Sequence, residues 1–183
     1  MAKMTRPPRN PRPLDPVRLN ELALSYVARF ATSAAKLEAY LRRKLRERGW
    51  EGEGEVPVAE TVQRMVAAGY VDDAVYARAK SGSLLRRGYG QRRVEQALGQ
   101  AGIAEAVRGE VRAGAGEQRR AALAMARKRR FGPFGAELPE REQREKQLAA
   151  LLRAGHPLDS ARVLVNAQSV DAAELWADGE DGE

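Results

Sequence analysis

The chain has 183 residues, 43% of them hydrophobic, which is long enough for one or two domains with a buried core. It contains no cysteine, so disulfides and thiolate metal sites are excluded, and a reducing cytoplasm is the expected compartment. The net charge is +7, and no apolar run approaches the length of a membrane span, so we expect no membrane partner.

The positive charge is unevenly distributed along the chain. From Asp171 to Glu183 there are six acidic and no basic side chains, so the preceding 170 residues carry 32 basic against 19 acidic side chains, a net charge of +13. Such an excess favours a polyanionic partner, above all nucleic acid or a nucleoprotein. The alternative is a generally solvated, arginine-rich surface of the kind that a GC-rich genome produces.

The first part of the chain is rich in proline and basic residues. Five prolines fall between Met1 and Pro16, which predicts an extended, solvated tail over residues 1–18. This tail either makes electrostatic contacts or has no role of its own. Beyond it, apolar residues recur with helical spacing almost everywhere, and alternating strand patterns are nearly absent.

Nine helices in three groups of three are expected after this tail. Ser33 and Asp72 have the side chains that favour a helix N-cap, and the third group opens with a very basic helix. The sequence therefore predicts an all-α fold of three tandem three-helix repeats, in an elongated molecule that can curve. We assign the repeats to residues 19–69, 70–115 and 116–168, followed by an acidic tail over residues 169–183.

Gly49, Gly102 and Gly155 mark the expected end of the second helix in each repeat. They fall 53 residues apart, and each has a leucine four residues earlier and a large side chain directly after it. Glycine ends a helix readily because it adopts the left-handed backbone conformation. The equal spacing is partly accidental, because loops of different length compensate, but the shared ending predicts a packing joint.

Little in the sequence supports catalysis. His156 is the only histidine, and it follows a helix stop, where packing explains it. Helix capping explains the adjacent Asp72 and Asp73, and Gly88-Tyr89-Gly90 lacks the lysine and hydroxyl residue of a phosphate loop. We therefore expect no enzyme activity, no cofactor and no metal site.

Each repeat has its own basic cluster, and a row of positive charge suits a long anionic partner. The alternative is a solvated outer face. Sequence-specific readout by a helix-turn-helix is not favoured, because the candidate second helices are short and poor in base-reading residues. The candidate partner- or DNA-binding residues are Arg42, Arg43, Lys44, Arg86, Arg87, Arg92, Arg93, Arg127, Lys128, Arg129 and Arg130.

Several motifs carry a family resemblance. The second repeat contains Gly69-Tyr70-Val71-Asp72-Asp73, Tyr76-Ala77, Arg87-Gly88-Tyr89-Gly90, Leu98 and Ala101-Gly102-Ile103. These residues look like the central signature of the RecX family of recombination regulators. The first repeat agrees through Ala23-Leu24-Ser25-Tyr26, and the third resembles the family's closing repeat through Leu152-Arg153-Ala154-Gly155. The resemblance covers roughly residues 19–168, with departures at Lys36, Ala101 and His156, where family members often have Glu, a basic residue and Phe.

The resemblance implies tandem three-helix repeats that bind the RecA recombinase and lie in the groove of the RecA–DNA filament. There such proteins restrain filament growth, ATP hydrolysis and strand exchange. It implies a non-enzymatic, cytoplasmic regulator of homologous recombination, DNA repair and the SOS response. From the basic clusters we expect single- or double-stranded DNA as a further partner, bound without sequence preference, and we expect a monomer. The alternatives are a non-specific DNA-binding helical-repeat protein and a helical scaffold for another protein.

Overall fold

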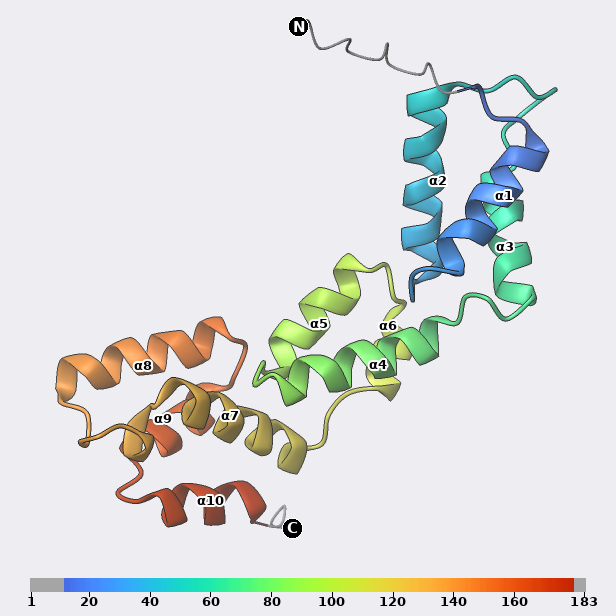
Figure 1. Ribbon diagram of the computed structural model, residues 1–183. Helices are drawn as coiled ribbons and strands as arrows, with labels where there is room; N and C mark the ends of the chain where they lie inside the picture. Colours follow the sequence, from blue (N-terminus) through green and yellow to red (C-terminus); the bar gives the residue numbers. More distant parts are fainter. Residues whose placement is uncertain (1–11, 180–183) are drawn as a thin grey trace, which may run out of the picture. The chain divides into compact units, whose positions relative to one another are not determined.

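The computed structural model describes residues 12–179, and helices make up the regular structure of this range apart from an isolated bridge between Leu14 and Trp50. The all-α fold class is thus confirmed (Figure 1). The helices are α1 (Pro16–Val27), α2 (Ala34–Arg48), α3 (Val58–Ala67), α4 (Asp73–Arg86), α5 (Gln91–Gln100), α6 (Glu105–Glu110), α7 (Ala115–Arg129), α8 (Arg141–Arg153), α9 (Leu158–Asn166) and α10 (Val170–Asp178), with a short 3-10 helix at Gly132–Phe134.

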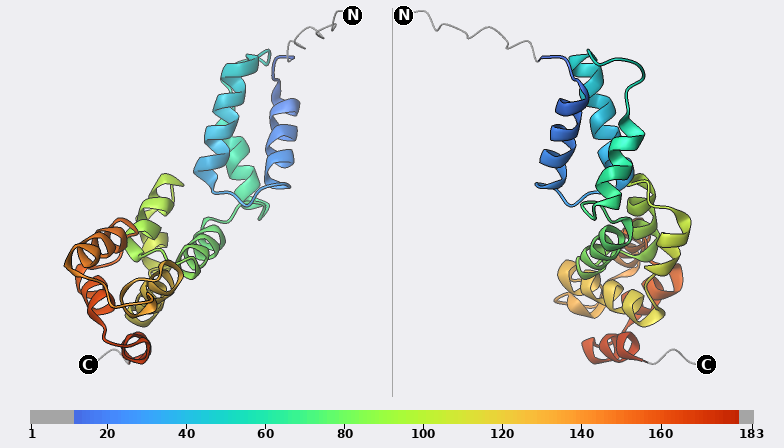
Figure 2. Two further views of the ribbon diagram at one scale, coloured as in Figure 1. Left: turned by 60° about the vertical axis from the view of Figure 1, so that its left-hand side comes forward. Right: turned by 90° about the vertical axis from the view of Figure 1, so that its right-hand side faces the viewer.

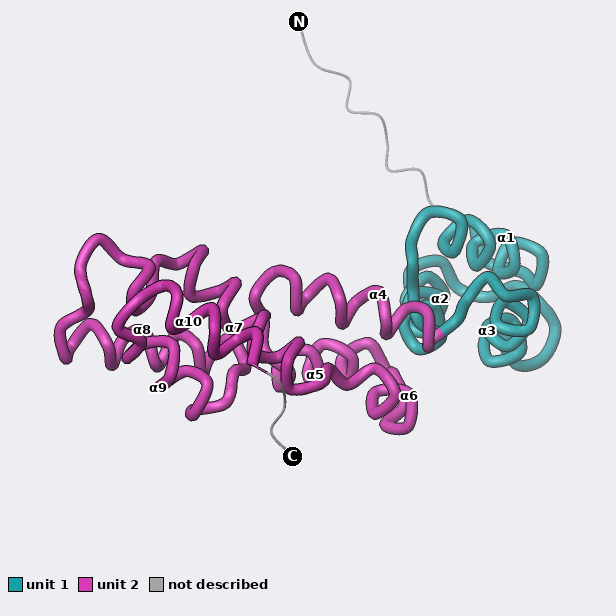
Figure 3. Tube along the Cα trace, turned by 90° about the horizontal axis from the view of Figure 1, so that it is seen from below, with its two compact units in different colours: residues 1–72 teal, residues 73–183 magenta. Residues whose placement is uncertain are grey.

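The chain forms two compact units, residues 1–72 and residues 73–183 (Figure 3). In the first unit, α1, α2 and α3 pack as a three-helix bundle (Figure 2). Leu19, Leu37 and Leu41 are fully buried at its centre, because they repeat at helical spacing on the inner faces of α1 and α2. Ser33 caps α2 as expected, since its hydroxyl accepts a hydrogen bond from the backbone N–H of Lys36 at 3.3 Å.

The expected tail over residues 1–18 needs correction at its end. Leu14 is fully buried, and it bonds to the α2–α3 connection through Leu14 N to Gly49 O at 3.0 Å and Glu51 N to Leu14 O at 2.9 Å. Helix α1 then begins at Pro16, because the Asp15 carboxylate caps it at 2.7 Å from the Arg18 N–H and proline suits the first helical position. Residues 1–11 of the predicted tail lie outside the described residues.

The second unit contains the helices from α4 to α10. Leu84, Val94 and Leu98 form one apolar cluster between α4 and α5, and Leu151 and Val165 belong to another between α8 and α9. Half-buried Tyr89 packs against both clusters. The helices expected as the second and third repeats therefore share one compact unit, while the residue bounds of the three repeats stay a prediction.

A close backbone contact joins two turns of the second unit, Gly88–Gly90 after α4 and Ala154–His156 after α8. Gly90 N donates to Ala154 O at 2.9 Å, and Arg92 N donates to Gly155 O at 3.3 Å. A Cβ atom on Gly90 would lie 2.3 Å from the carbonyl carbon and oxygen of Gly155, so only glycine allows this approach. We call this contact the turn–turn joint.

His156 completes the turn–turn joint. Its side chain is 3% exposed, and its Nε2 lies 2.9 Å from Gly88 O. Because a carbonyl oxygen only accepts, Nε2 carries the proton, and the buried Nδ1 has no hydrogen-bond partner among the described residues. The packing role predicted for this histidine agrees with its position, and the joint sets α4 and α5 beside α8.

The expected helix endings occur at all three glycines, with φ of +80° at Gly49, +72° at Gly102 and +97° at Gly155. The second and third endings share a reciprocal pattern, in which the glycine N–H and the following N–H bond back into the last turn. The first ending differs because Trp50 continues into the bridge with Leu14. The shared motif therefore covers two of the three sites.

The expected acidic tail over residues 169–183 also needs correction. Its described part contains helix α10, which Ser169 caps by accepting from Ala172 N at 3.1 Å. Ala173 and Ala177 are fully buried, and Ala173 packs in one cluster with Ala122 and Ala126 of α7. Small residues at this spacing give a helix an apolar face despite its acidic composition. The described residues thus contain ten α-helices, one more than expected, none of them long and apolar enough to cross a bilayer.

The turn–turn joint predicts a severe effect for Gly90→Ala. The added Cβ would meet backbone atoms of Gly155 and His156 at 2.3–2.5 Å, so the two turns must separate. We expect the free energy of unfolding to fall by about 1–3 kcal/mol or more, measured by urea denaturation followed by circular dichroism. Gly109→Ala is the matched control, because its Cβ meets nothing within 4 Å and it lies in helix α6. Equal stability of the two variants would contradict the close contact.

His156 predicts a pH dependence of stability. Burial lowers its pKa below the ordinary value of 6.5, against the smaller raising effect of the hydrogen bond to Gly88 O. As the pH falls, His156 therefore takes up a proton in the unfolded chain before it does so in the folded one. The contribution of the buried neutral histidine to stability is fully present above pH 6.5 and is lost as the pH falls from there through the lowered pKa. Urea denaturation between about pH 7.5 and 5 measures this loss. His156→Phe cannot titrate and should flatten the curve; an unchanged slope would contradict the assignment.

Candidate nucleic-acid interface

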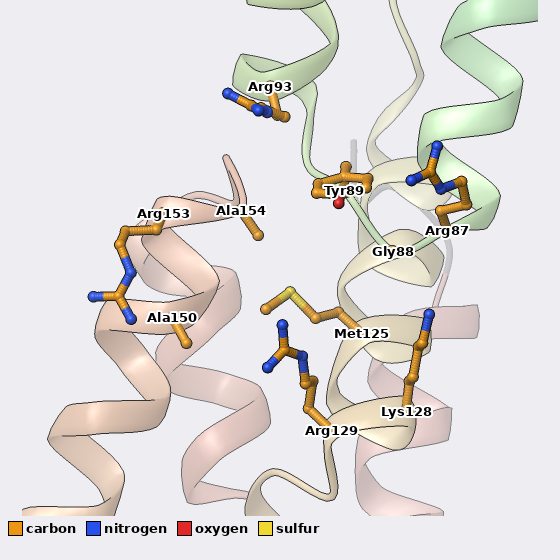
Figure 4. A pocket seen from close by; sticks show the side chains of 10 residues that line it. All are labelled: Arg87, Gly88, Tyr89, Arg93, Met125, Lys128, Arg129, Ala150, Arg153 and Ala154. Carbon is orange, nitrogen blue, oxygen red and sulfur yellow. The ribbon is translucent and has the colours of Figure 1, made fainter. Parts of the chain in front are cut away.

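A pocket of about 560 Å³ lies within the second unit, lined by residues of the α4–α5 turn and of α5, α7 and α8 (Figure 4). Five of its lining residues are basic and none is acidic. Figure 4 shows Arg129 reaching from α7 toward Met125 in the space before α8, and Lys128 extending on the other side of α7 toward the end of α4. The five basic residues, which we call the basic pocket, are Arg87, Arg93, Lys128, Arg129 and Arg153.

The ends of three helices place most of these charges. Arg87 directly follows α4, while Arg129 and Arg153 are the last residues of α7 and α8. A cation at a helix C-terminus is locally favourable, since the carbonyl end of the helix carries partial negative charge. The turn–turn joint and the close approach of Gly88 to Met125, where a Cβ would lie 2.9 Å from Met125 N, bring these helix ends together.

The basic pocket has no acidic partner of its own. In the described part of the chain none of its five cations forms an ion pair with a carboxylate. The Arg87 guanidinium lies over the Tyr89 ring at 5.4 Å from its centroid, and Arg93 donates to Gln96 at 2.7 Å. Like charges around one pocket repel each other, so a bound anion would lower the electrostatic free energy.

The positive surface continues beyond this pocket. Arg93 and Arg153 also line a neighbouring pocket of about 500 Å³, together with Arg92 and Gln96. The guanidinium of Arg92 donates to Leu152 O at the end of α8, which fixes it beside Arg153. Four of the expected site residues, Arg87, Arg93, Lys128 and Arg129, thus meet in one place, and Arg92 lies next to them.

The expected cluster on α2 has a different environment. Arg42 pairs with Glu38 at 2.7 Å, and Glu47 pairs with both Lys44 at 2.6 Å and Arg43 at 3.7 Å. The Lys44 hydrogen bond is the main cause that holds the pKa of Glu47 below its ordinary value. These charges are largely compensated within the helix, and they belong to the first unit.

Three other expected residues lie outside the basic pocket. Arg86 is exposed at the end of α4, and Arg130 follows α7 with a positive φ of +56°. Arg127 forms an ion pair with Glu174 of α10, and its guanidinium lies 5.6 Å from the centroid of the Phe134 ring. The acidic helix therefore occupies this part of the basic surface of α7.

Arg153 was not expected from the sequence. It stands alone rather than in a run of basic residues, so a search for basic clusters passes over it. The sequence signal for this residue was its position two residues before Gly155, which marks the end of α8. The turn–turn joint places this helix end beside α5, and so Arg153 lies beside the basic residues there.

Potential metal ligands do not gather at the basic pocket in the described residues. Within residues 12–179 no three His, Asp or Glu side chains lie together as potential metal ligands. The only histidine is buried in the turn–turn joint, where Gly88 O takes its hydrogen bond. The chemistry available here is the electrostatic binding of an anion.

Comparison with known proteins gives consistent results. Residues 72–111 match the family model described as the second three-helix domain of RecX. Two crystal structures share the fold: RecX from Lactobacillus salivarius, with a TM-score of 0.64 and 18% identity over 85% of this chain and 96% of that one, and a regulatory protein RecX, with a TM-score of 0.63 and 20% identity over 81% of this chain and 70% of that one.

A relative from Myxococcus xanthus strain DK1622 carries the family assignment. It is named regulatory protein RecX, and it is 34% identical to this chain over 173 residues, which cover 90% of this chain and 92% of the relative. Since the identity extends across nearly the whole of both proteins, this chain belongs to the RecX family of regulatory proteins.

Proposed function

We propose that this protein binds RecA–DNA filaments and restrains RecA ATPase activity, filament growth and strand exchange. It acts as a non-enzymatic regulator of homologous recombination and DNA repair in the SOS response. Membership of the RecX family supports the regulatory class. The basic pocket supports an anionic partner, because five cations without acidic partners converge there.

The charge pattern favours the second unit as the main contact with the filament. Arg87, Lys128 and Arg129 are exposed and free of carboxylate partners in the described residues, whereas Arg42 and Arg43 are paired within α2. A contact that replaces no internal ion pair retains more of its Coulomb energy. Further weak contacts from the first unit would raise the affinity by multivalency, because the filament presents the same subunit surface repeatedly.

A non-specific DNA-binding protein is the second candidate function. The basic pocket would then hold phosphates directly, with no need for RecA. The absence of acidic side chains among its lining residues favours this candidate as much as a nucleoprotein partner. The two candidates differ in whether naked DNA is bound at physiological ionic strength.

Charge reversal in the basic pocket tests the leading proposal. We expect the protein to lower the ATPase rate of RecA on single-stranded DNA, and the double variant Lys128→Glu/Arg129→Glu to need on the order of tenfold more protein for the same effect. Arg42→Glu/Arg46→Glu is the matched control on α2, because both residues are exposed and neither borders the Tyr40 ring, and its expected change is only a few-fold. Circular dichroism checks that both variants keep their helices.

Two outcomes would contradict the proposal. If the wild-type protein at stoichiometric amounts leaves ATPase rate, filament length and strand exchange unchanged, the protein is not a filament modulator. If the α2 variant loses as much activity as the pocket variant, the contact is not concentrated in the second unit.

Salt dependence separates the two candidate functions. The affinity for naked DNA should fall with a slope of log K against log salt near −0.7 for each phosphate contacted on a single strand or −0.9 on a duplex. We expect weak binding at physiological salt, and a shallower slope for Arg87→Gln/Arg129→Gln, measured by fluorescence anisotropy. Tight binding of naked duplex at physiological salt would favour the direct DNA-binding function.

A further inference from the structure

Three aromatic rings form a continuous group on the first unit. The Tyr26 and Tyr40 rings stack with centroids 4.2 Å apart and planes at 19°, and Phe30 lies against Tyr26 at 5.3 Å. Tyr26 belongs to α1, Tyr40 belongs to α2, and Phe30 lies in the connection between these helices. We call Tyr26, Phe30 and Tyr40 the aromatic platform.

The platform is open at one end and supported at the other. Tyr26 and Tyr40 are half-buried and pack against the core of the first unit, so their positions are fixed. Phe30 is 56% exposed. The Phe30 ring is tilted by 47° from the Tyr26 ring, and its exposed phenyl face offers an apolar surface on which a further ring can stack.

Cations border this surface. Arg43 lies 5.6 Å and Lys44 lies 5.9 Å from the centroid of the Tyr40 ring, and exposed Arg29 directly precedes Phe30. Glu47 is the carboxylate that pairs with Arg43 and Lys44, so two cations share one negative charge. The border therefore keeps a positive excess, which disfavours a cationic partner.

We propose that the aromatic platform binds single-stranded nucleic acid. A ligand that combines flat aromatic rings with negative charge fits a stacking surface with a positive border, and a single strand has both features in every nucleotide. Its bases stack on Phe30, and its phosphates lie near Arg29 and Arg43. A duplex fits poorly, because its bases already stack on each other inside the helix.

This binding goes beyond the proposed regulation of RecA. In the proposal above, the basic pocket holds phosphates through its five cations, whereas the aromatic platform requires bases. It also belongs to the first unit, while the basic pocket belongs to the second. The two sites can therefore be tested separately, and RecA is left out of the experiment.

The test compares oligonucleotides with and without bases on the full chain. Fluorescence anisotropy at low salt measures affinity for a labelled oligo-dT, for an abasic strand of the same length and for a duplex. Loss of one stacked base predicts a decrease of roughly five- to a hundredfold in oligo-dT affinity for Phe30→Ala. Phe30→Trp should retain wild-type affinity or exceed it, with indole fluorescence quenched on binding, and Phe30→Leu should behave like Phe30→Ala.

Tyr70→Ala provides a matched control. Tyr70 is 58% exposed and lies in the first unit, but it belongs to no ring pair in the described residues. We expect it to leave oligo-dT affinity unchanged, and we expect Phe30→Ala to leave abasic-strand affinity unchanged. Equal oligo-dT affinity of Phe30→Ala and wild type would overturn the proposal, and so would an equal loss for the abasic strand or the duplex. An acidic protein segment as the true occupant would give the first of these results.

A pocket variant distinguishes the two proposals. Lys128→Glu/Arg129→Glu lowers the overall nucleic-acid affinity if the basic pocket holds phosphates. When Phe30→Ala is added to this double variant, the oligo-dT affinity should fall by the same factor as it does in the wild-type protein. If Phe30→Ala no longer lowers the oligo-dT affinity in the double variant, the aromatic platform does not bind independently of the basic pocket, and the proposal is overturned. Unchanged RecA activity together with base-dependent binding would contradict the filament function while leaving the platform intact.

Discussion

The turn–turn joint is the contact on which the second unit depends. Main chains meet there without intervening side chains, because Gly90 and Gly155 each leave space that the other turn fills. The His156–Gly88 hydrogen bond closes the same contact from the buried side. The two turns follow the ends of α4 and α8, and the first of them leads into the start of α5. The joint therefore fixes the positions of these helix ends, which form walls of the basic pocket. The close packing of the two turns thus determines where the charges of the basic pocket lie.

The basic clusters differ more in whether their cations form ion pairs with nearby carboxylates than in how many basic residues they contain. Seen as sequence, Arg42-Arg43-Lys44 and Lys128-Arg129 are both uninterrupted runs of basic residues. In the fold, acidic residues three or four positions away form ion pairs with each cation of the first cluster, while the second faces other cations across a pocket. The physical reason is local: α2 carries Glu38 and Glu47 at helical spacing, whereas the pocket-facing residues of α7 and α8 include no acid.

Much of the fold could be predicted from periodicity and stop signals, but the site only in part. Ser33 and the positive-φ glycines define helix limits through local chemistry, which a sequence displays directly. Arg153 lies in the basic pocket because of a contact some sixty positions away along the chain, in which Arg92 donates to the neighbouring Leu152 O, so a search for runs of basic residues does not find it. Composition misled at α10, because acidic residues there hide the buried face of Ala173 and Ala177.

The ion pair between Arg127 and Glu174 has a consequence for ion release. Salt that screens a bound polyanion also screens this internal pair, which makes Arg127 more available as the ionic strength rises. At low salt fewer basic side chains of the protein would then contact phosphates than at high salt. The number of phosphates inferred from a salt titration is therefore an underestimate wherever Arg127 takes part, and the buried alanines of α10 keep the helix in place while its charge contact weakens.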